Sequence, residues 1–182
     1  MIEITIWGRG GQGAVTTGQI LAIGAFLDGN ECQTFPHFGV ERGGAPVQAF
    51  VRIDDKKINI RSQVYDSDVV MVLDPSLLQA VDVTSGLKKG GVLIINSEKK
   101  PNKLGIKNGF KIYTVDATSA AMKIFGKPFV NTCILGAFSA ITKKVSIKSL
   151  EKAIDEKFVK LKGKKLADLN KEALKEVYSK LR

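Results

Sequence analysis

The sequence has little of the chemistry on which metal and cluster sites depend. It contains one histidine, His37, and two cysteines, Cys32 and Cys133, among 182 residues. A single imidazole excludes a site built from several histidines, and two thiols far apart in sequence cannot hold an iron–sulfur cluster or a zinc ion unaided. We therefore expect both cysteines to be reduced, buried thiols.

Long apolar runs and a secretion signal are also missing. No hydrophobic stretch reaches the roughly 20 residues that a membrane-spanning helix needs. The first residues, Met1–Glu3, lack the basic segment and cleavage site of a signal peptide. These absences predict a cytoplasmic protein with no membrane partner. A hydrophobic content of 44% is typical of a globular chain, and the length predicts one domain over residues 1–182.

The charge is strongly basic, at +10, with 28 Lys and Arg against 18 Asp and Glu. Most of the excess is lysine and lies between Lys143 and Lys180, where lysines alternate with apolar residues at helical spacing. That pattern indicates solvated helix faces. The sequence shows neither an aromatic-rich strand pair nor a helix-turn-helix pattern, so we expect no nucleic-acid partner. An acidic partner surface or an anionic ligand would explain the charge equally well.

Strand-like and helix-like segments alternate, which predicts an α/β fold: a three-layer α/β/α sandwich with a mostly parallel sheet. We expect strands at 2–7, 31–34, 69–73, 92–95 and 111–115, and helices at 12–28, 76–87, 117–125, 132–141, 147–161 and 166–181. An alternating segment at 46–53, a polar turn at 54–57 and a return at 58–60 predict an inserted β-hairpin. Ser146 is expected to cap the helix after it, and Gly136 to allow close helix packing.

A glycine-rich turn joins the first strand to the first helix. Its sequence is Gly8-Arg9-Gly10-Gly11-Gln12-Gly13, which matches the spacing of the Rossmann dinucleotide loop. Such a turn brings backbone N–H groups at a helix N-terminus close to an anion. An NAD site also needs an acidic residue at the end of the second strand, roughly 20 residues later. Glu31 begins that strand and nothing acidic ends it, so an independent NAD(P)-dependent oxidoreductase is a weak alternative.

A second unusual loop follows the second strand, at residues 35–47. It combines aromatic residues, His37, the adjacent pair Glu41 and Arg42, and three glycines, Gly39, Gly43 and Gly44. Loops of this length are usually functional when they are too apolar to be disordered. Since the loop follows a strand, we expect it at the same carboxyl edge of the sheet as the glycine turn, where open α/β sheets bind ligands. A surface loop whose charges meet only water is the alternative.

Three separated segments carry a resemblance to a known family. They are Gly8–Gly13, Phe38–Ile53 and Asn131–Phe138, and they resemble the gamma subunit of 2-oxoacid:ferredoxin oxidoreductases, especially of the pyruvate enzyme. The segment Leu150–Ile154, followed by Asn170, Ala173 and Tyr178, resembles the tail of the same subunit, so the resemblance covers nearly the whole chain. Many pyruvate-type members have a second basic residue where this chain has Gly43. That departure leaves the choice of 2-oxoacid open.

The resemblance implies a subunit of a larger enzyme. The family's complex converts a 2-oxoacid, coenzyme A and oxidised ferredoxin to acyl-CoA, carbon dioxide and reduced ferredoxin, or runs in reverse. Its thiamine diphosphate, Mg and 4Fe–4S clusters are expected on the alpha, beta and ferredoxin-like delta subunits, which also reach ferredoxin. We expect no catalytic residue and no metal ligand in this chain.

The resemblance also suggests what each candidate residue does. This chain would cover the thiamine site and help to hold coenzyme A. Gly8, Gly10, Gly11 and Gly13 would shape the loop, Gln12 would donate a hydrogen bond, and Arg9 would meet an anion. Glu41 and Arg42 would contact the catalytic subunits or the coenzyme. The alternative is a non-catalytic scaffold, in which the glycine loop only packs against a partner.

Overall fold

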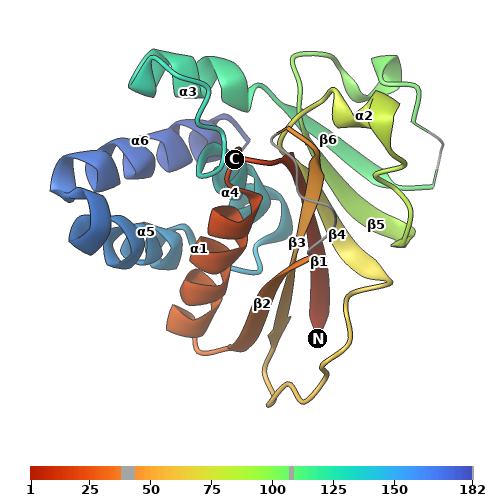
Figure 1. Cartoon of the computed structure of the whole chain (residues 1–182), viewed down its shortest axis with the longest axis horizontal. Coiled ribbons are helices and arrows are strands. Elements are labelled where there is room, and N and C mark those ends of the chain that lie inside the picture. Colours follow the sequence, from red (N-terminus) through yellow and green to blue (C-terminus); the bar gives the residue numbers. More distant parts are fainter. Residues whose placement is uncertain (38–43, 107–108, 182) are drawn as a thin grey trace.

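A six-stranded sheet, in the order β2-β3-β1-β4-β5-β6, forms the centre of the computed structural model (Figure 1). The structure describes residues 1–37, 44–106 and 109–181. The strands are β1 (Ile2–Arg9), β2 (Glu31–His37), β3 (Pro46–Asp54), β4 (Ser67–Val72), β5 (Leu87–Asn96) and β6 (Lys111–Val115). Strands β1, β4, β5 and β6 pair in parallel, whereas β3 runs antiparallel to its neighbours β1 and β2. The mostly parallel sheet is thus confirmed.

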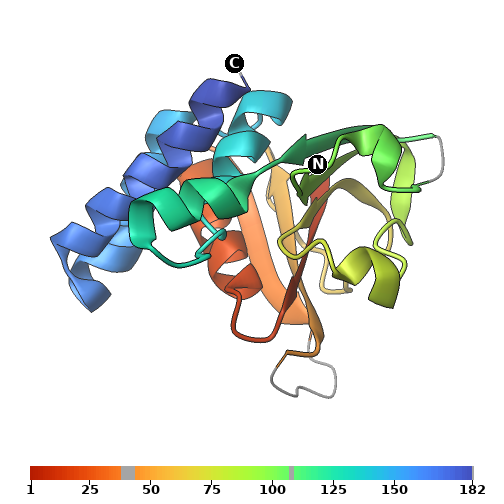
Figure 2. The same ribbon diagram turned by 90° about the horizontal axis from the view of Figure 1, so that it is seen from above.

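The long helices gather on one face of this sheet (Figure 2). They are α1 (Ala14–Leu27), α3 (Ala117–Phe125), α4 (Cys133–Thr142), α5 (Ile147–Lys162) and α6 (Lys164–Lys180). The main core lies between them and the sheet, where Ile4 and Ile6 of β1 are fully buried. Gly136 of α4 has no side chain to hold the helices apart, and its Cα lies directly against the backbone of α6 at Leu174. The close packing predicted at Gly136 is confirmed.

The opposite face of the sheet carries a thinner layer. Its helices are α2 (Leu77–Ala80) and the short 3₁₀ helix η1 (Pro101–Lys103). A smaller core lies beneath them, formed by apolar side chains such as Val70, Leu77 and Leu93. The helix predicted at 76–87 ends at Ala80, so the prediction was wrong for the residues after it. The chain turns instead at Asp82, whose carboxylate accepts hydrogen bonds from the backbone and hydroxyl of Thr84.

The hairpin predicted between residues 46–53 and 58–60 does not form. No strand forms at residues 58–60. A return strand would have to pair with β3, but β1 and β2 already occupy both of its edges. The antiparallel element is instead the pair β2 and β3. The segment after β3 crosses the thin face, where Arg52 donates to the carbonyl oxygens of Ser62 and Gln63.

The cap predicted at Ser146 is confirmed. Its Oγ accepts a hydrogen bond from the backbone N–H of Ser149 at 3.2 Å, in the first turn of α5. Cys32 and Cys133 are both free thiols, as expected, but only Cys133 is buried; the burial predicted for Cys32 was wrong, because this residue is half-buried. Burial raises the pKa of Cys133 to about 12, so this thiol stays protonated at neutral pH. Within the described residues, no helix has the length and apolarity to cross a bilayer.

Candidate functional site at the glycine loop

The loop between β1 and α1 has the backbone geometry that its glycines predict. Gly11 and Gly13 have φ values of 92° and 83°, in the left-handed region that side chains disfavour. Gly8 lies so close to its surroundings that a Cβ there would stand 3.2 Å from Leu73 and 3.3 Å from Ala14. Gly13 is the N-cap of α1, and no side chain caps the helix. The N–H groups of the first turn are therefore open to an anion.

Two side chains of the loop reach the end of β4. The Gln12 amide donates to Asp74 Oδ2 at 2.7 Å, while its Oε1 accepts from the backbone N–H of Arg9 at 2.8 Å. The Arg9 guanidinium lies 3.3 Å from the same Asp74 oxygen and donates to Ser76 Oγ at 2.8 Å. The two residues that we expected to face a ligand are thus already bonded within the chain.

The Asp74 carboxylate is ionised in this network. Partial burial alone would raise its pKa, but hydrogen bonds from Ser76 and Gln12 and the charge of Arg9 outweigh that effect and lower it. Its negative charge offsets the positive charge of Arg9. The attraction for an anion at this loop therefore rests on backbone N–H groups more than on the Arg9 side chain.

The second loop meets the glycine loop where the structure describes it. Gly10 N–H donates to Ala45 O, and Arg9 Nη1 donates to Gly44 O, both at 2.9 Å. The shared edge is confirmed for this described end of the loop. The other expected site residues of the loop, Gly39, Glu41, Arg42 and Gly43, lie outside the described residues.

A cavity of about 580 Å³ opens beside the α1 N-terminus. Its walls come from the glycine loop, the first turn of α1, the end of β2 and the start of β3. They include Arg9, Gly10, Gly11, Gly13, Ala14, Val15, Thr16, Pro36, His37, Val47 and Gln48. The cavity is large enough for part of an extended cofactor. The sequence did not predict Gln48 as a wall residue, because only the β2–β3 pairing brings it beside His37.

The sheet order differs from that of a Rossmann dinucleotide site. There, β1 and the strand after the first helix are neighbours, so the acid at the end of that strand reaches the ribose. Here β3 lies between β1 and β2. The end of β2 therefore stands two strands, or roughly 10 Å, from the end of β1. The strand–turn–helix exists, but the dinucleotide arrangement around it does not.

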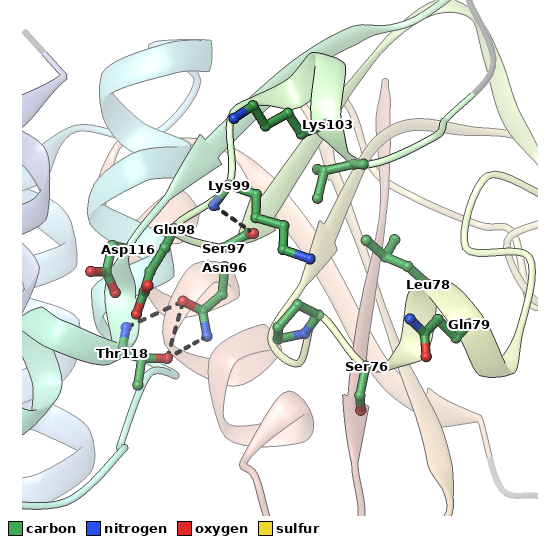
Figure 3. A pocket seen from close by; sticks show the side chains of 12 residues that line it. Ser76, Leu78, Gln79, Asn96, Ser97, Glu98, Lys99, Lys103, Asp116 and Thr118 are labelled. Atoms are coloured by element: carbon green, nitrogen blue, oxygen red, sulfur yellow. Dashed lines mark hydrogen bonds between the residues drawn. The ribbon is translucent and has the colours of Figure 1, made fainter.

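A second cavity, of about 530 Å³, lies at the carboxyl ends of β4 and β5 (Figure 3). Asn96 and Thr118 face each other on one side of it, with Leu78 and Gln79 on the other. The buried Asn96 amide donates to Leu73 O and to Thr118 Oγ1, each at 2.9 Å. These polar groups hold β4, β5 and α3 together. Among the described residues, no group of three or more His, Cys, Asp and Glu side chains is placed to hold a metal ion.

Comparison with known proteins decides the family. The family model for pyruvate ferredoxin/flavodoxin oxidoreductase matches residues 3–180. The chain belongs to this family. The pyruvate synthase subunit PorC of Methanocaldococcus jannaschii is 52% identical over 181 residues, which cover 100% of this chain and 97% of that protein. The resemblance seen in the sequence is confirmed.

Two further relatives agree on which subunit this is. The pyruvate/ketoisovalerate oxidoreductases common subunit gamma of Thermococcus litoralis is 54% identical over 95% of both chains. The crystal structure of the pyruvate oxidoreductase subunit PORC from Thermotoga maritima has a TM-score of 0.83 and 36% identity, covering 98% of this chain and 95% of that one. The chain is a gamma subunit of a 2-oxoacid ferredoxin oxidoreductase, and other subunits complete the enzyme.

Proposed function

We propose that this gamma subunit places its glycine-loop edge over the thiamine site of the catalytic subunits and contributes to coenzyme A binding. The complex would convert a 2-oxoacid, coenzyme A and oxidised ferredoxin to acyl-CoA, carbon dioxide and reduced ferredoxin, or run in reverse. Its alpha, beta and delta subunits would carry the thiamine diphosphate, Mg and 4Fe–4S clusters. Ferredoxin would exchange electrons with the complex through those subunits.

The observation that supports a coenzyme role is the cavity at the uncapped N-terminus of α1. The phosphates of coenzyme A suit backbone N–H groups at a helix N-terminus, where the helix dipole also favours negative charge. Gly11 and Gly13 present backbone without side-chain bulk on this wall. The cavity thus fits an anionic part of the coenzyme. Bound there, the coenzyme would supply the thiol that accepts the acyl group.

A scaffold role without coenzyme contact is the second candidate. The observation that favours it is the internal pairing of Arg9 and Gln12 with Asp74. This network makes the loop rigid without a ligand, as a surface that only packs against a partner would require. An independent NAD(P)-dependent enzyme has less support, because β3 separates the strands that would form its ribose site. A thermal-shift titration with NAD and NADP should leave the melting temperature of the isolated subunit unchanged.

The decisive experiment places a charge in the cavity without disturbing the fold. Val15 lies in the first turn of α1, and its side chain is 37% exposed at the cavity wall. Val15→Glu adds a carboxylate where the helix dipole favours one, so folding should be preserved. Val15→Gln adds the same bulk without the charge. We expect Val15→Glu to raise the KM for coenzyme A on the order of tenfold over Val15→Gln in the assembled complex.

The assay is coenzyme A-dependent reduction of a viologen dye by pyruvate, with 2-oxoglutarate and a branched 2-oxoacid as further substrates. Equal KM values for coenzyme A in the two variants, in complexes of normal composition, would show that the coenzyme does not bind in this cavity. Loss of assembly by both variants would favour the scaffold. The same assay tests Arg42. If Arg42→Ala does not change coenzyme A affinity or assembly, Arg42 is not part of the site.

We infer that the choice of 2-oxoacid rests with the partner subunits. The Thermococcus litoralis relative is, by its name, common to pyruvate and ketoisovalerate oxidoreductases. One gamma subunit serving two substrates is compatible with a chain that contacts the coenzyme rather than the 2-oxoacid. The Val15 and Arg42 variants should therefore leave the relative rates with the three 2-oxoacids unchanged. A shift in those relative rates would place substrate selection in this chain.

A further inference from the structure

The turn between α5 and α6 concentrates positive charge at one end of the helical layer. Residues 157–165 contain five lysines and no acidic residue: Lys157, Lys160, Lys162, Lys164 and Lys165. None of the five forms an ion pair within the described part of the chain, whereas Lys171 and Lys175 further along α6 do. The α5–α6 turn that carries this lysine cluster lies at the end of the helical layer away from the sheet (Figures 1 and 2).

An apolar groove runs from this cluster to the glycine loop. Its volume is about 300 Å³, and large apolar side chains line it together with the backbone of Gly11 and Gly13. Two of them are unusually exposed for their size: Leu161 at 71% and Phe129 at 49%. Lys157 is fixed on its rim by a 2.7 Å hydrogen bond to Gln19 of α1. The groove therefore offers apolar anchoring points, and two lysines of the cluster, Lys157 and Lys162, line it.

The groove borders the cavity described above. Gly11, Gly13 and Thr16 line both, so the two hollows lie on either side of the α1 N-terminus. The Thr17 hydroxyl shares its proton between Gly13 O at 3.0 Å and Asn131 O at 3.2 Å, which ties the start of α1 to the segment before α4. A partner seated in the groove would thus stand directly beside the glycine loop.

We propose that the lysine cluster and this groove form a docking surface for an acidic segment of a partner subunit, which inserts an apolar side chain between Phe129 and Leu161. The chain is one subunit of a multi-subunit enzyme, so part of its surface must be covered by other chains. Lysines without an ion pair, two of them in the groove beside the exposed Phe129 and Leu161, match an acidic peptide anchored by an apolar side chain. Apolar anchors supply most of the affinity at such interfaces, while rim charges set the association rate and its salt dependence.

The first test maps the contact in the intact complex. A carbodiimide joins lysine amines directly to carboxylates that touch them, so it reports ion pairs between subunits. We expect cross-links from the lysine cluster to Asp or Glu residues of another subunit, identified by mass spectrometry of the complex. Cross-links only to a second copy of this chain, or only within the chain, would overturn the proposal. So would the absence of cross-links at these lysines.

The second test reverses the charge. Lys164→Glu with Lys165→Glu places two acids at the start of α6, where the helix dipole tolerates them. The matched control is Lys56→Glu with Lys57→Glu, an identical change in net charge in the exposed turn after β3, at the opposite edge of the sheet. We expect the first pair to weaken association of the subunit on the order of tenfold at low salt, and the control to have no effect. Equal association for both pairs would contradict the proposal.

The apolar half is tested by Leu161→Ala. Because Leu161 is exposed, the melting temperature of the isolated subunit should not change, whereas association should weaken on the order of tenfold. Unchanged association would show that Leu161 is not an apolar anchor of the docking surface. The proposal rests on membership of the complex and not on coenzyme A binding. Complexes that still assemble with these variants should keep the normal KM for coenzyme A, so failure of one proposal leaves the other standing.

Discussion

Gln12 and Asp74 link the ends of β1 and β4. On one side of these neighbouring strands lie β3 and β2, and on the other lie β5 and β6. The Gln12 amide donates to Asp74 Oδ2 at 2.7 Å, and so ties the loop after β1 to the end of β4. The chain winds from β1 toward β2 and β3 on one side and from β4 toward β6 on the other. Open α/β sheets bind ligands in the crevice at such a point. Here the crevice is bridged by side chains that hold the glycine loop in place.

Asp74→Ala removes the acceptor for three donors at once: Gln12, Arg9 and the backbone of Ser76. Since the carboxylate is partly buried, we expect the free energy of unfolding to fall by about 1–3 kcal/mol. Chemical denaturation of the isolated subunit measures the loss. Glu98→Ala, which removes an exposed carboxylate, is the control and should change stability by less than about 0.5 kcal/mol. An equal effect of the two variants would show that the network does not stabilise the loop.

The sequence predicts the elements with strong local patterns. Ala117–Phe125 is helical over the expected residues, because Asp116 caps it and Gly126 ends it in the left-handed conformation. The helix predicted at 76–87 was too long. Its apolar residues pack in the thinner layer on the sheet, and Asp82 favours a turn over a helix. Hairpin pairing at 46–60 was wrong because strand partners depend on the whole sheet, which local alternation does not encode.

Part of the candidate site could also be predicted from the sequence, and part could not. The glycines of Gly8–Gly13 were predictable, because a left-handed turn before a helix requires glycine. Asp74, the residue that engages Arg9 and Gln12, was not predicted as part of the site. The available signal was its place two residues after the buried strand β4, at the same edge of the sheet as the loop. A sequence alone does not say that a polar residue after one strand meets the loop after another.

Arg52 offers a test of a buried charge. Its side chain is 1% exposed, donates to Glu3 at 2.9 Å and lies 5.4 Å from the ring centroid of Phe35. Arg52→Met leaves Glu3 without its partner and two carbonyl oxygens without their donors. We expect a loss of about 3–5 kcal/mol in the free energy of unfolding. Arg61→Met, at an exposed site, is the matched control. A loss below about 1 kcal/mol for Arg52→Met would show that water replaces the lost partners.

Gly136→Ala tests the contact between α4 and α6. The added methyl would collide with the backbone carbonyl oxygen of Leu174, which cannot move without shifting α6. We expect destabilisation of about 1–3 kcal/mol, despite the higher helix propensity of alanine. Gly24→Ala is the comparison, because its methyl would meet the side chains of Leu150 and Val145, which can rotate away. If both variants are equally stable by thermal unfolding, the α4–α6 contact is looser than the structure shows.

Asp28 links the end of α1 to the start of α5 and makes stability depend on pH. Its carboxylate accepts from Ser146 N–H and Ser149 Oγ, both at 2.6 Å. Partial burial alone would raise its pKa, but the hydrogen bonds from Ser149 and Ser146 outweigh burial and lower it. The bonds therefore contribute stability above the unfolded pKa of about 3.9, and this stability is lost as pH falls through the lower folded pKa.

Asp28→Asn should accordingly cost about 0.5–1 kcal/mol at pH 7, a modest value because solvent screens this exposed carboxylate. The difference from the wild-type subunit should shrink as pH falls below about 3.9, because the unfolded chain then binds a proton that the folded carboxylate takes up only at lower pH. Urea unfolding of both proteins between pH 7 and pH 3 measures this convergence. Asp66→Asn, at an exposed site, controls for the change in net charge. A difference that stays constant over this range would mean that Asp28 acts through its shape and not through its charge.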